Sequence, residues 1–489
     1  MSGVFRYKSV ILALTAFLAA SCNWNEVIDD VKQMPPEIIL DNTSAVYTMT
    51  AGEELTISPS YKYVKDAEYA WTCEGKLLAT TPSLRYTDDV VHSVYIQITV
   101  RTEAGSASDE IRVDVTARPP EPGPEPQPEP DDEFWVFPQT VFNVSLGRSI
   151  LLKPYDIRED DGINYIWTVD GAVTQDAATP EFVFVAGQEG SHEVSVTHGS
   201  LSQTLTVNVC PAEGTYYRPA AASCDSAVSR IFEFTPAPGQ YVNADYSATT
   251  AEEAAAYAAE RFKAVNYVSL GGFGGYIIAG FDHSVDNSGG YDISITSYLS
   301  KEYTEAGVVW VMQDENGDGL PNDTWYELKG SDTFEESTIH DYSVTYYRPS
   351  GPGMSVQWTD NQGGSGTVSY MAAYHPQDWY YPLWIAEDRY TLRGTRLEAH
   401  NYDSSGNGTN WVNPPYAWGY VDNYSELDML GSRDTNHFRI SDAVKYDGSP
   451  ANLKYIDFVK VQNALNAKSG WLGEISTEVC GIYDHNLNR

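Results

Sequence analysis

The segment 314–323 has the clearest pattern of possible metal-binding residues in the sequence. It reads Asp-Glu-Asn-Gly-Asp-Gly-Leu-Pro-Asn-Asp, so side-chain oxygens fall at loop positions 1, 3 and 5 and a glycine falls at position 6. This is the front half of a calcium loop, in which oxygen ligands surround Ca²⁺. The predicted ligands are Asp314, Asn316, Asp318, the carbonyl of Leu320, and Asp323.

Two features separate this loop from an EF-hand. Position 12 is Trp325 instead of a bidentate glutamate, and the flanking segments have the pattern of strands. Asp323 or Glu327 could close the site instead. Because Asp and Asn also form turns without a metal, a structural Ca²⁺ site and a plain turn both stay open. Mg²⁺ is disfavoured, since it loses its water shell reluctantly.

Two aromatic segments, 374–384 and 411–424, form the second candidate site. Neither has the periodicity of a strand or a helix, so both are predicted to be loops. Aromatic rings interleaved with Asn and Asp are typical of platforms for sugars and other flat ligands, and loop packing is the alternative. The candidate ligand-binding residues are Trp379, Trp384, Trp411, Trp418, Asp378 and Asn413.

No catalytic residue can be assigned from the sequence. His283, His375, His400 and His437 form no pair with metal-ligand spacing, and there is no G-x-S-x-G motif. Asp282-His283, next to a glycine-rich strand, is the most notable of these positions. The glycines of 271–275 lead into a strand rather than a helix, which favours close approach of strands over nucleotide binding.

The elements that must position these residues are mostly strands. Within 211–489, the segments 276–281, 308–312 and 456–461 read as strands between Gly, Asn, Asp and Pro turns. A capping box at Thr250–Glu253 predicts one helix that runs to Lys263. We therefore expect a jelly-roll-like β-sandwich with long loops and one short helix.

An internal repeat with an offset of 96 residues precedes this domain. The segment 69–75 (YAWTCEG) matches 165–171 (YIWTVDG), and each copy continues into two strands with period-two alternation. The repeat predicts two small antiparallel sandwiches, at 36–117 and 134–210, with Trp71 and Trp167 in their cores. The repeated pattern resembles the polycystic-kidney-disease (PKD) domain, which has an immunoglobulin-like fold.

The remaining segments predict export and a stiff connection between modules. Residues 1–22 have a basic start, a short apolar stretch and small residues before Cys22, which favours a lipoprotein signal with Cys22 as the lipidated residue over an ordinary secretory signal. An acidic tether is predicted at 23–35. Alternating prolines make 118–133 an extended polyproline II spacer. In an exported chain, Cys210 and Cys224 could form a disulfide.

Composition excludes several classes of protein. Hydrophobic residues make up 42% of the 489 residues and charged residues 20%, which is incompatible with a wholly disordered chain. The 68 acidic and 30 basic residues give a formal net charge of -38, so nucleic acid is not an expected partner.

The chain as a whole resembles PKD-containing cell-surface lipoproteins of Bacteroidota. The resemblance rests on the two modules and on the segments 272–283, 310–314, 325–330 and 456–462. It implies display at the outer membrane through a lipid anchor, near uptake systems for nutrients. The expected function is capture of a glycan, or else a corrinoid, for a TonB-dependent outer-membrane transporter. An adhesion or structural protein is the alternative. A hydrolase is the third hypothesis, which two close buried carboxylates in a cleft would favour.

Overall fold

The computed structural model describes residues 34–42, 44–73, 75–116, 137, 139–155 and 162–487. The chain divides into two compact units, residues 1–132 and residues 133–489. The predicted signal with Cys22, nearly all of the acidic tether and the proline-rich spacer lie outside the described residues. Among the described residues, no helix is both long enough and apolar enough to span a membrane.

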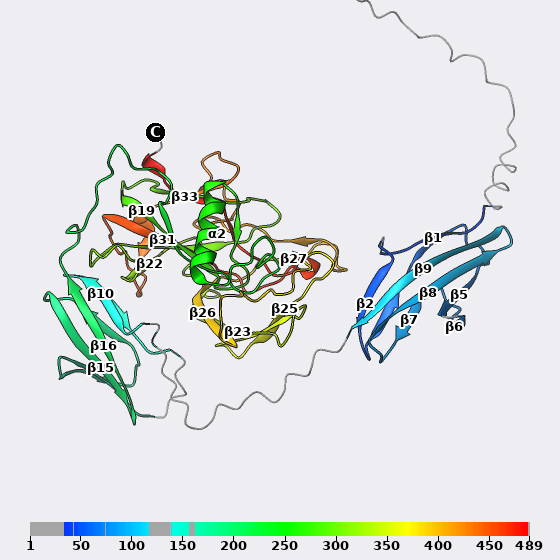
Figure 1. Ribbon diagram of the computed structural model, residues 1–489, viewed down its shortest axis with the longest axis horizontal. Coiled ribbons are helices and arrows are strands. Elements are labelled where there is room, and N and C mark those ends of the chain that lie inside the picture. Colours follow the sequence, from blue (N-terminus) through cyan, green and yellow to red (C-terminus); the bar gives the residue numbers. More distant parts are fainter. Residues whose placement is uncertain are drawn as a thin grey trace, which may run out of the picture. The chain divides into compact units, whose positions relative to one another are not determined.

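The first unit is an Ig-like sandwich (Figure 1). A five-stranded sheet with the order β2-β9-β8-β5-β6 packs on the pair β3-β7, and β2 runs parallel to β9. Trp71 is fully buried in this core, where its indole nitrogen donates to the carbonyl of Thr81 (2.9 Å). The strands are β1 (Glu37–Ile39), β2 (Val46–Thr50), β3 (Glu54–Ile57), β4 (Ser60–Lys62), β5 (Glu68–Cys73), β6 (Lys76–Ala79), β7 (Leu84–Thr87), β8 (His92–Thr102) and β9 (Gly105–Thr116).

The second unit begins with a sandwich of the same topology. Its main sheet has the order β10-β16-β15-β12-β13 with β10 parallel to β16, and β11 pairs with β14. Both modules shift register directly after the tryptophan of the repeat, and Trp167 is fully buried like Trp71. The repeat therefore predicted both the fold and the core position of its tryptophan. The strands are β10 (Val141–Ser145), β11 (Ser149–Leu152), β12 (Tyr165–Val169), β13 (Ala172–Ala177), β14 (Phe182–Val185), β15 (Gly190–His198) and β16 (Leu201–Cys210).

The C-terminal domain is built on a six-stranded antiparallel sheet with the order β17-β19-β31-β21-β22-β30. One face packs against the three-stranded sheet β29-β20-β33, with apolar residues of both sheets in one core. The elements here are β17 (Arg230–Thr235), α2 (Ala251–Lys263), β18 (Val268–Ser269), β19 (Tyr276–Asp286), β20 (Ile293–Thr296), β21 (Gly307–Met312), β22 (Trp325–Leu328), β29 (Thr435–Phe438), β30 (Ala443–Val444), β31 (Tyr455–Asn463), β32 (Glu478–Val479) and β33 (Gly481–Asp484).

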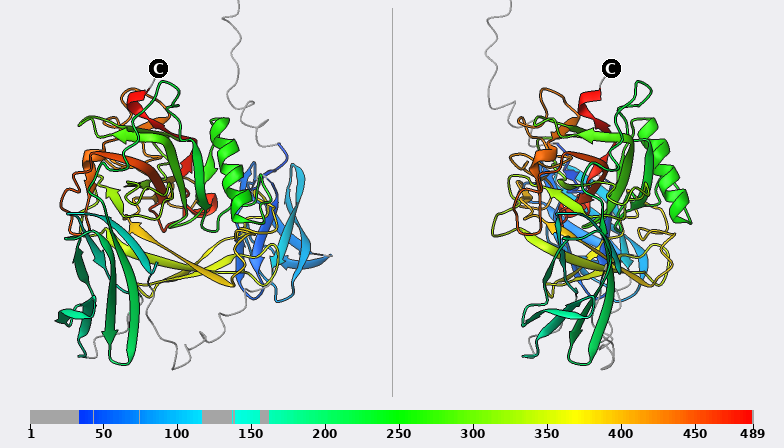
Figure 2. Two further views of the ribbon diagram at one scale, coloured as in Figure 1. Left: turned by 60° about the vertical axis from the view of Figure 1, so that its left-hand side comes forward. Right: turned by 90° about the vertical axis from the view of Figure 1, so that its left-hand side faces the viewer.

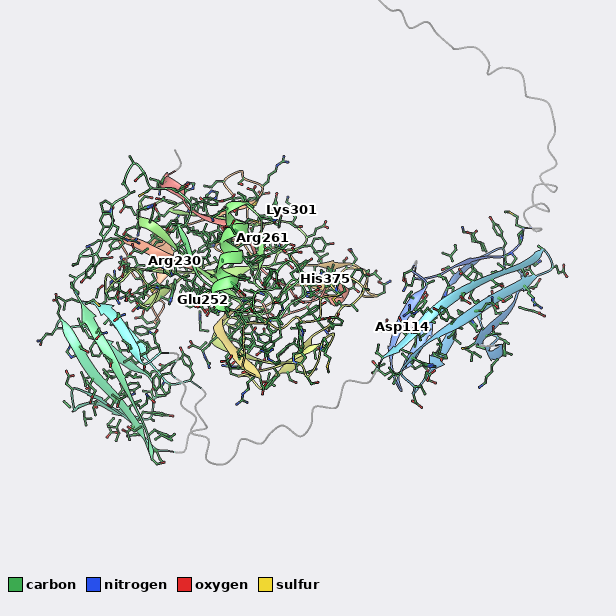
Figure 3. All side chains as sticks on the ribbon, viewed as in Figure 1. Asp114, Arg230, Glu252, Arg261, Lys301 and His375 are labelled. Atoms are coloured by element: carbon green, nitrogen blue, oxygen red, sulfur yellow. The ribbon has the colours of Figure 1, made fainter. Side chains whose placement is uncertain are left out.

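Helix α2 covers the edge strand β17 through the buried residues Ala254, Ala258 and Phe262. The predicted cap is present, because the Thr250 side chain accepts from the backbone N–H of Glu253 (3.2 Å). Figure 3 shows Glu252 and Arg261 near opposite ends of this helix. Acidic residues in the first turn and basic residues in the last turn also complement the helix dipole.

A four-stranded sheet with the order β25-β24-β23-β26 forms a further layer (yellow in Figure 2). Its own core holds Tyr342, Tyr346, Tyr380 and Tyr381, all fully or almost fully buried, with Phe273. The strands are β23 (Ile339–Tyr347), β24 (Val356–Asp360), β25 (Ser365–Val368) and β26 (Arg389–Arg396), and the pair β27 (Tyr402–Asp403) and β28 (Trp411–Val412) lies in the loops. The predicted mostly β architecture is confirmed, with α2 as the α-helix among the described residues.

The glycines of 271–275 permit close backbone packing, as predicted. Gly271 has φ +70°, and a Cβ there would lie 1.9 Å from the carbonyl oxygen of Ala237. At Gly275 a Cβ would lie 1.8 Å from the carbonyl oxygen of Leu270. Among the cysteines, Cys210 and Cys224 are both free thiols, so the disulfide considered for them is not formed.

Candidate functional site

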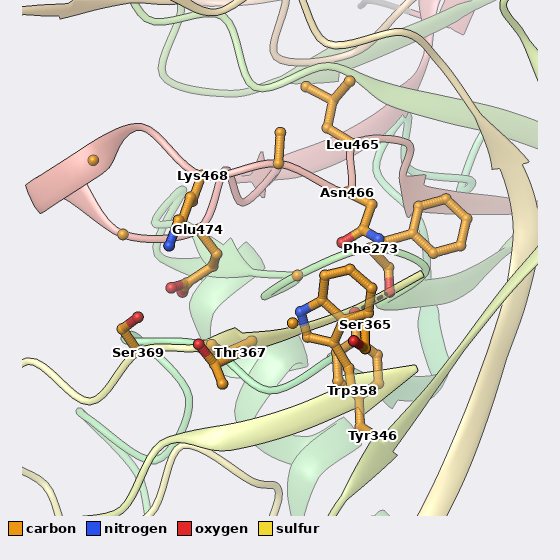
Figure 4. A pocket seen from close by; sticks show the side chains of 16 residues that line it. Phe273, Tyr346, Trp358, Ser365, Thr367, Ser369, Leu465, Asn466, Lys468 and Glu474 are labelled. Carbon is orange, nitrogen blue, oxygen red and sulfur yellow. Dashed lines mark hydrogen bonds between the residues drawn. The ribbon is translucent and has the colours of Figure 1, made fainter. Parts of the chain in front are cut away.

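A cavity of about 280 Å³ opens beside Trp358 in the C-terminal domain (Figure 4). We call it the Trp358 cavity. Strands β24 and β25 form one wall and the segment 465–474 forms the other. The lining residues are Gly272, Phe273, Tyr346, Trp358, Ser365, Gly366, Thr367, Val368, Ser369, Leu465, Asn466, Ala467, Lys468, Gly470, Gly473 and Glu474.

The aromatic wall follows from the register of the four-stranded sheet. Trp358 on β24 pairs with Tyr346 on β23 and with Gly366 on β25, so the three residues form one row across the sheet. A Cβ on Gly366 would lie only 2.5 Å from the six-membered ring of Trp358, so the indole rests directly on the glycine backbone. Trp358 is half-buried and lines the cavity, where its ring can serve as a stacking surface.

Residues of β25, the Asn466 amide and the Lys468 side chain line other parts of the cavity. Ser365 and Thr367 alternate along β25 with Gly366, the cross-strand neighbour of Trp358, so their side chains belong to the opposite face of the sheet from the indole. Asn466 on the opposite wall donates from Nδ2 to the hydroxyl of Tyr342 (2.7 Å), which in turn donates to Asp360 (2.5 Å). This chain of hydrogen bonds fixes the orientation of the Asn466 amide.

Glu474 supplies the carboxylate of the cavity. Its Oε1 accepts from the backbone N–H of Gln240 (2.5 Å), whereas Oε2 is buried without a hydrogen-bond partner among the described residues. Burial raises the pKa of Glu474 to about 7, and the backbone hydrogen bonds oppose this rise. A buried acceptor without a partner marks a place for a ligand or a water molecule.

The predicted aromatic loops support the Trp358 cavity from behind without lining it. Asn413 is buried, and its Oδ1 accepts from the hydroxyl of Ser469 (2.7 Å) in the 465–474 wall. Trp411 lies against Gly470, where a Cβ would be 2.1 Å from the indole nitrogen. The segment 374–384 holds the turn that carries Gln240, through hydrogen bonds from Gln377 to the carbonyls of Gln240 (2.6 Å) and Val242 (3.1 Å).

The other predicted ligand-binding residues are dispersed. Trp384 packs beside the main core, with its ring centroid 6.3 Å from that of Phe234. Trp379 and Trp418 are half-buried and Asp378 is exposed. The six residues do not converge on one surface, and ligand binding by them stays a prediction. Trp358 and Glu474 were not among the predicted site residues, because only folding brings residues so distant in sequence together.

The predicted calcium loop is a hydrogen-bonded turn beside the second sandwich. The two Asp314 oxygens accept from the N–H groups of Gly317 (2.8 Å) and Gly319 (3.0 Å), and Asp318 Oδ1 accepts from the N–H of Leu320 (2.8 Å). Asn316 accepts from the N–H of Asp318 (2.9 Å).

Asp323 lies deeper in the same loop. Its Oδ2 accepts from the N–H of Glu315 (2.9 Å), while its Oδ1 is buried without a hydrogen-bond partner among the described residues. Burial raises the pKa of Asp323 to about 7. The neighbouring Glu315 accepts from the backbone N–H of Ser145 in the second sandwich (3.0 Å). The loop therefore joins two modules, and Ca²⁺ binding stays a prediction.

A larger cleft of about 540 Å³ lies between the second sandwich and the C-terminal domain. Trp310 and Trp325 line it, and the ammonium group of Lys460 lies 5.2 and 5.9 Å from their ring centroids. Lys153 of the second sandwich forms an ion pair with Asp341 of β23, and both residues line the cleft. This ion pair bridges the two walls of the cleft.

Comparisons with known proteins agree with the modular architecture. The PKD-like domain family matches residues 35–102. No curated protein sequence matches the chain. Among solved structures, the fibronectin(III)-like modules of Clostridium thermocellum CbhA are 15% identical, with 38% of this chain and 100% of theirs covered and a TM-score of 0.16.

Two further solved structures contain Ig-type modules. Titin M4 is 20% identical, with 17% of this chain and 95% of that chain covered and a TM-score of 0.15. The Ig1-2 module of the Drosophila receptor protein tyrosine phosphatase DLAR is 14% identical, with 36% and 99% covered and a TM-score of 0.15. TM-scores this low support no inference about this chain. The first sandwich is PKD-like, and the architecture is consistent with a cell-surface or adhesion-type protein.

Proposed function

We propose that this chain is a cell-surface binding protein that captures a nutrient, a glycan in the first place, in the Trp358 cavity. The observation that carries the proposal is the combination of the half-buried Trp358 indole, the Asn466 amide and the Glu474 carboxylate around a single cavity. Sugars present an apolar ring face that stacks on an indole, and hydroxyl groups that bind carboxylates and amides.

The size of the cavity limits what it can enclose. Its volume of about 280 Å³ lies just below the usual range of small-ligand sites, about 300–1,000 Å³. A single sugar unit at the end of a glycan fits this volume better than a long internal stretch of polymer. A corrinoid is too large to be enclosed and would bind here only through a side group.

The lining favours binding over hydrolysis. Glycosidases of the usual type need two carboxyl groups on either side of the scissile bond, and Glu474 is the only carboxylate among the described lining residues. Burial raises the pKa values of Glu305, Asp422 and Glu478 as well, but these residues do not line the cavity.

The sequence adds the cellular setting to this proposal. Lipidation at Cys22 would hold the protein at the outer membrane, and the spacer would extend the reach of the C-terminal domain. In this setting, the captured nutrient passes to a TonB-dependent outer-membrane transporter. Adhesion through the Ig-like modules is the competing function.

A binding screen on the whole purified protein tests the proposal. The probes are a panel of mono- and oligosaccharides, together with cyanocobalamin as a corrinoid. We expect at least one glycan to bind, and its affinity to fall in Trp358→Ala but not in Trp325→Ala, which alters a half-buried indole in the other cleft. Binding of cyanocobalamin alone would assign the ligand to the corrinoids. Binding of none of the probes would favour adhesion.

A further inference from the structure

A cluster of three metal-ligating side chains lies at strand β19 of the six-stranded sheet, and none of the three lines the Trp358 cavity. Cys224 Sγ, a carboxylate oxygen of Asp282 and a ring nitrogen of His283 all lie within 4.8 Å of one another. His283 Nδ1 and Asp282 Oδ1 are 2.7 Å apart. His283 is fully buried, Cys224 is half-buried and Asp282 is exposed, so the cluster reaches from the interior to solvent.

A β-bulge in β19 brings the side chains of the consecutive residues Asp282 and His283 next to each other. Adjacent side chains of a regular strand point to opposite faces of the sheet. The register of β19 against β31 shifts between Gly280 and Val285, a segment that contains Asp282 and His283. Such bulges redirect side chains and occur frequently beside functional sites. The bulge lets the Asp282 and His283 side chains lie next to each other.

Backbone pairing fixes the segment that carries Cys224. Val228 donates to the carbonyl of Ile482 (3.0 Å), and Asp484 donates to the carbonyl of Ser226 (2.7 Å). On the other side, Ser229 donates to the carbonyl of Gly280 (2.9 Å). The chain directly after Cys224 is thus held between β33 and β19, and the thiol is positioned by two strands.

A second carboxylate orients the histidine. His283 Nε2 lies 3.0 Å from Asp484 Oδ2, and Asp484 is itself buried. Histidines that bind metals almost always donate their other ring N–H to a carboxylate, a carbonyl or a water molecule. If Nε2 donates to Asp484, the lone pair of Nδ1 is directed at the space between Asp282 and Cys224. The arrangement thus supplies ligands together with the outer partner that a metal site requires.

We propose that Cys224 Sγ, Asp282 and His283 Nδ1 bind one Zn²⁺ ion, with Asp484 orienting the histidine and a solvent molecule in the fourth position. Thiolate and imidazole ligands select zinc over calcium, and three protein ligands with one open position are typical of accessible zinc sites. On binding, Nδ1 coordinates the ion through its lone pair and Nε2 keeps the proton that it donates to Asp484, so the thiol proton and any proton shared between Nδ1 and Asp282 are released to solvent. This site goes beyond the proposed capture of a glycan and does not depend on it.

Cobalt substitution provides a direct test, because thiolate ligation to Co²⁺ gives a charge-transfer absorption band that oxygen ligands do not give. The untagged full-length protein is titrated with Co²⁺ and then with Zn²⁺. We expect one equivalent of Co²⁺ to produce the band, one equivalent of Zn²⁺ to abolish it, and excess Ca²⁺ to leave it unchanged. The absence of the band from the wild-type protein would overturn the proposal.

Three variants and one matched control assign the ligands. Cys224→Ser should lose the band, and Asp282→Asn should weaken Zn²⁺ binding at least tenfold. Asp484→Asn should keep the band but lower affinity about 10–100-fold, the usual effect of an outer partner. The control Cys73→Ser, which removes a similarly half-buried cysteine from the other unit, should behave as wild type. A band that persists in Cys224→Ser, or disappears in Cys73→Ser, would contradict the assignment. A melting curve of each variant confirms that it is folded.

Discussion

The indole of Trp358 rests on the backbone of Gly366, its cross-strand neighbour, and a Cβ at position 366 would lie 2.5 Å from the ring. The glycine therefore sets the position of the ring that forms the aromatic wall of the Trp358 cavity. Because of this contact, a substitution at Gly366 can move the Trp358 ring while the tryptophan itself is kept.

The first prediction follows from this contact. Gly366→Ala should displace the indole and weaken glycan binding roughly tenfold, which corresponds to about 1.4 kcal/mol. Titration calorimetry beside a melting curve measures both affinity and stability. Gly351→Ala is the control, because a Cβ there would meet only the sulfur of Met354 at 3.7 Å. Equal affinities in the two variants would mean that the position of the Trp358 ring is irrelevant to binding.

The second prediction concerns pH and Glu474. Burial raises its pKa from 4.5 to about 7, so the folded state holds the proton more tightly than the unfolded state. Its contribution to stability is therefore full below about pH 4.5 and is lost as the pH rises through 7. Glu474→Gln should remove this part of the pH dependence, on the order of 1 kcal/mol after allowance for partial solvent access.

Glycan binding should have the opposite pH dependence. An ionised carboxylate accepts stronger hydrogen bonds from sugar hydroxyls than a protonated one, so affinity should rise between about pH 6 and pH 8. Calorimetric titrations at several pH values measure this rise, which Glu474→Gln should flatten. An affinity that falls over this range would show that Glu474 does not contact the ligand in its ionised form.

The third prediction tests the calcium loop. If Asp314, Asn316, Asp318, Leu320 O and Asp323 bind Ca²⁺, a chelator should lower the melting temperature, because an ion that binds only the folded state stabilises it. Asp318→Ala should lose this sensitivity. Asp447→Ala should retain it, since Asp447 caps an exposed turn elsewhere, at Ser449. Identical melting curves of the wild-type protein in Ca²⁺ and in chelator would leave the loop as a plain turn.

The fourth prediction concerns the membrane anchor. Cys22→Ala should move the protein from the membrane fraction to the soluble fraction, because several acyl chains on one residue give stable attachment and no other anchor is predicted. Fractionation followed by immunoblotting measures the shift. The processed N-terminus must be determined as well, since an uncleaved signal would hold the variant at the membrane for another reason. A variant that stays membrane-bound after cleavage would rule out lipidation at Cys22 as the anchor.

Local patterns in the sequence predicted much of the fold. The repeated Trp-Thr motif predicted two sandwiches with buried tryptophans, and the capping box predicted the start of α2 at Thr250. Short apolar runs between Gly, Asn, Asp and Pro turns predicted the strands that became β19, β21 and β31. These features depend on neighbours within a few residues, which the sequence displays directly.

The candidate site depends on contacts that the sequence does not display. The register of strands β23, β24 and β25 positions Trp358. Glu474 lies in a segment more than 100 residues later in the sequence. The aromatic loops were selected for their composition, yet Trp411 and Asn413 lie behind the wall that lines the cavity. Asp282 and His283 likewise lie side by side at a bulge in β19, and Cys224 reaches them through the backbone pairing of residues 226–229 with β33 and β19.

The affinity of Trp358→Ala for the glycan that binds the wild-type protein best tests the central claim most directly. Calorimetric titration of the whole protein should show a Kd at least tenfold higher in Trp358→Ala, with a Kd within about twofold of wild type in Trp325→Ala, since a stacking surface contributes on the order of 1 kcal/mol or more. Both variants should retain the melting transition of the folded domain. A folded Trp358→Ala protein with wild-type affinity would contradict capture in the Trp358 cavity.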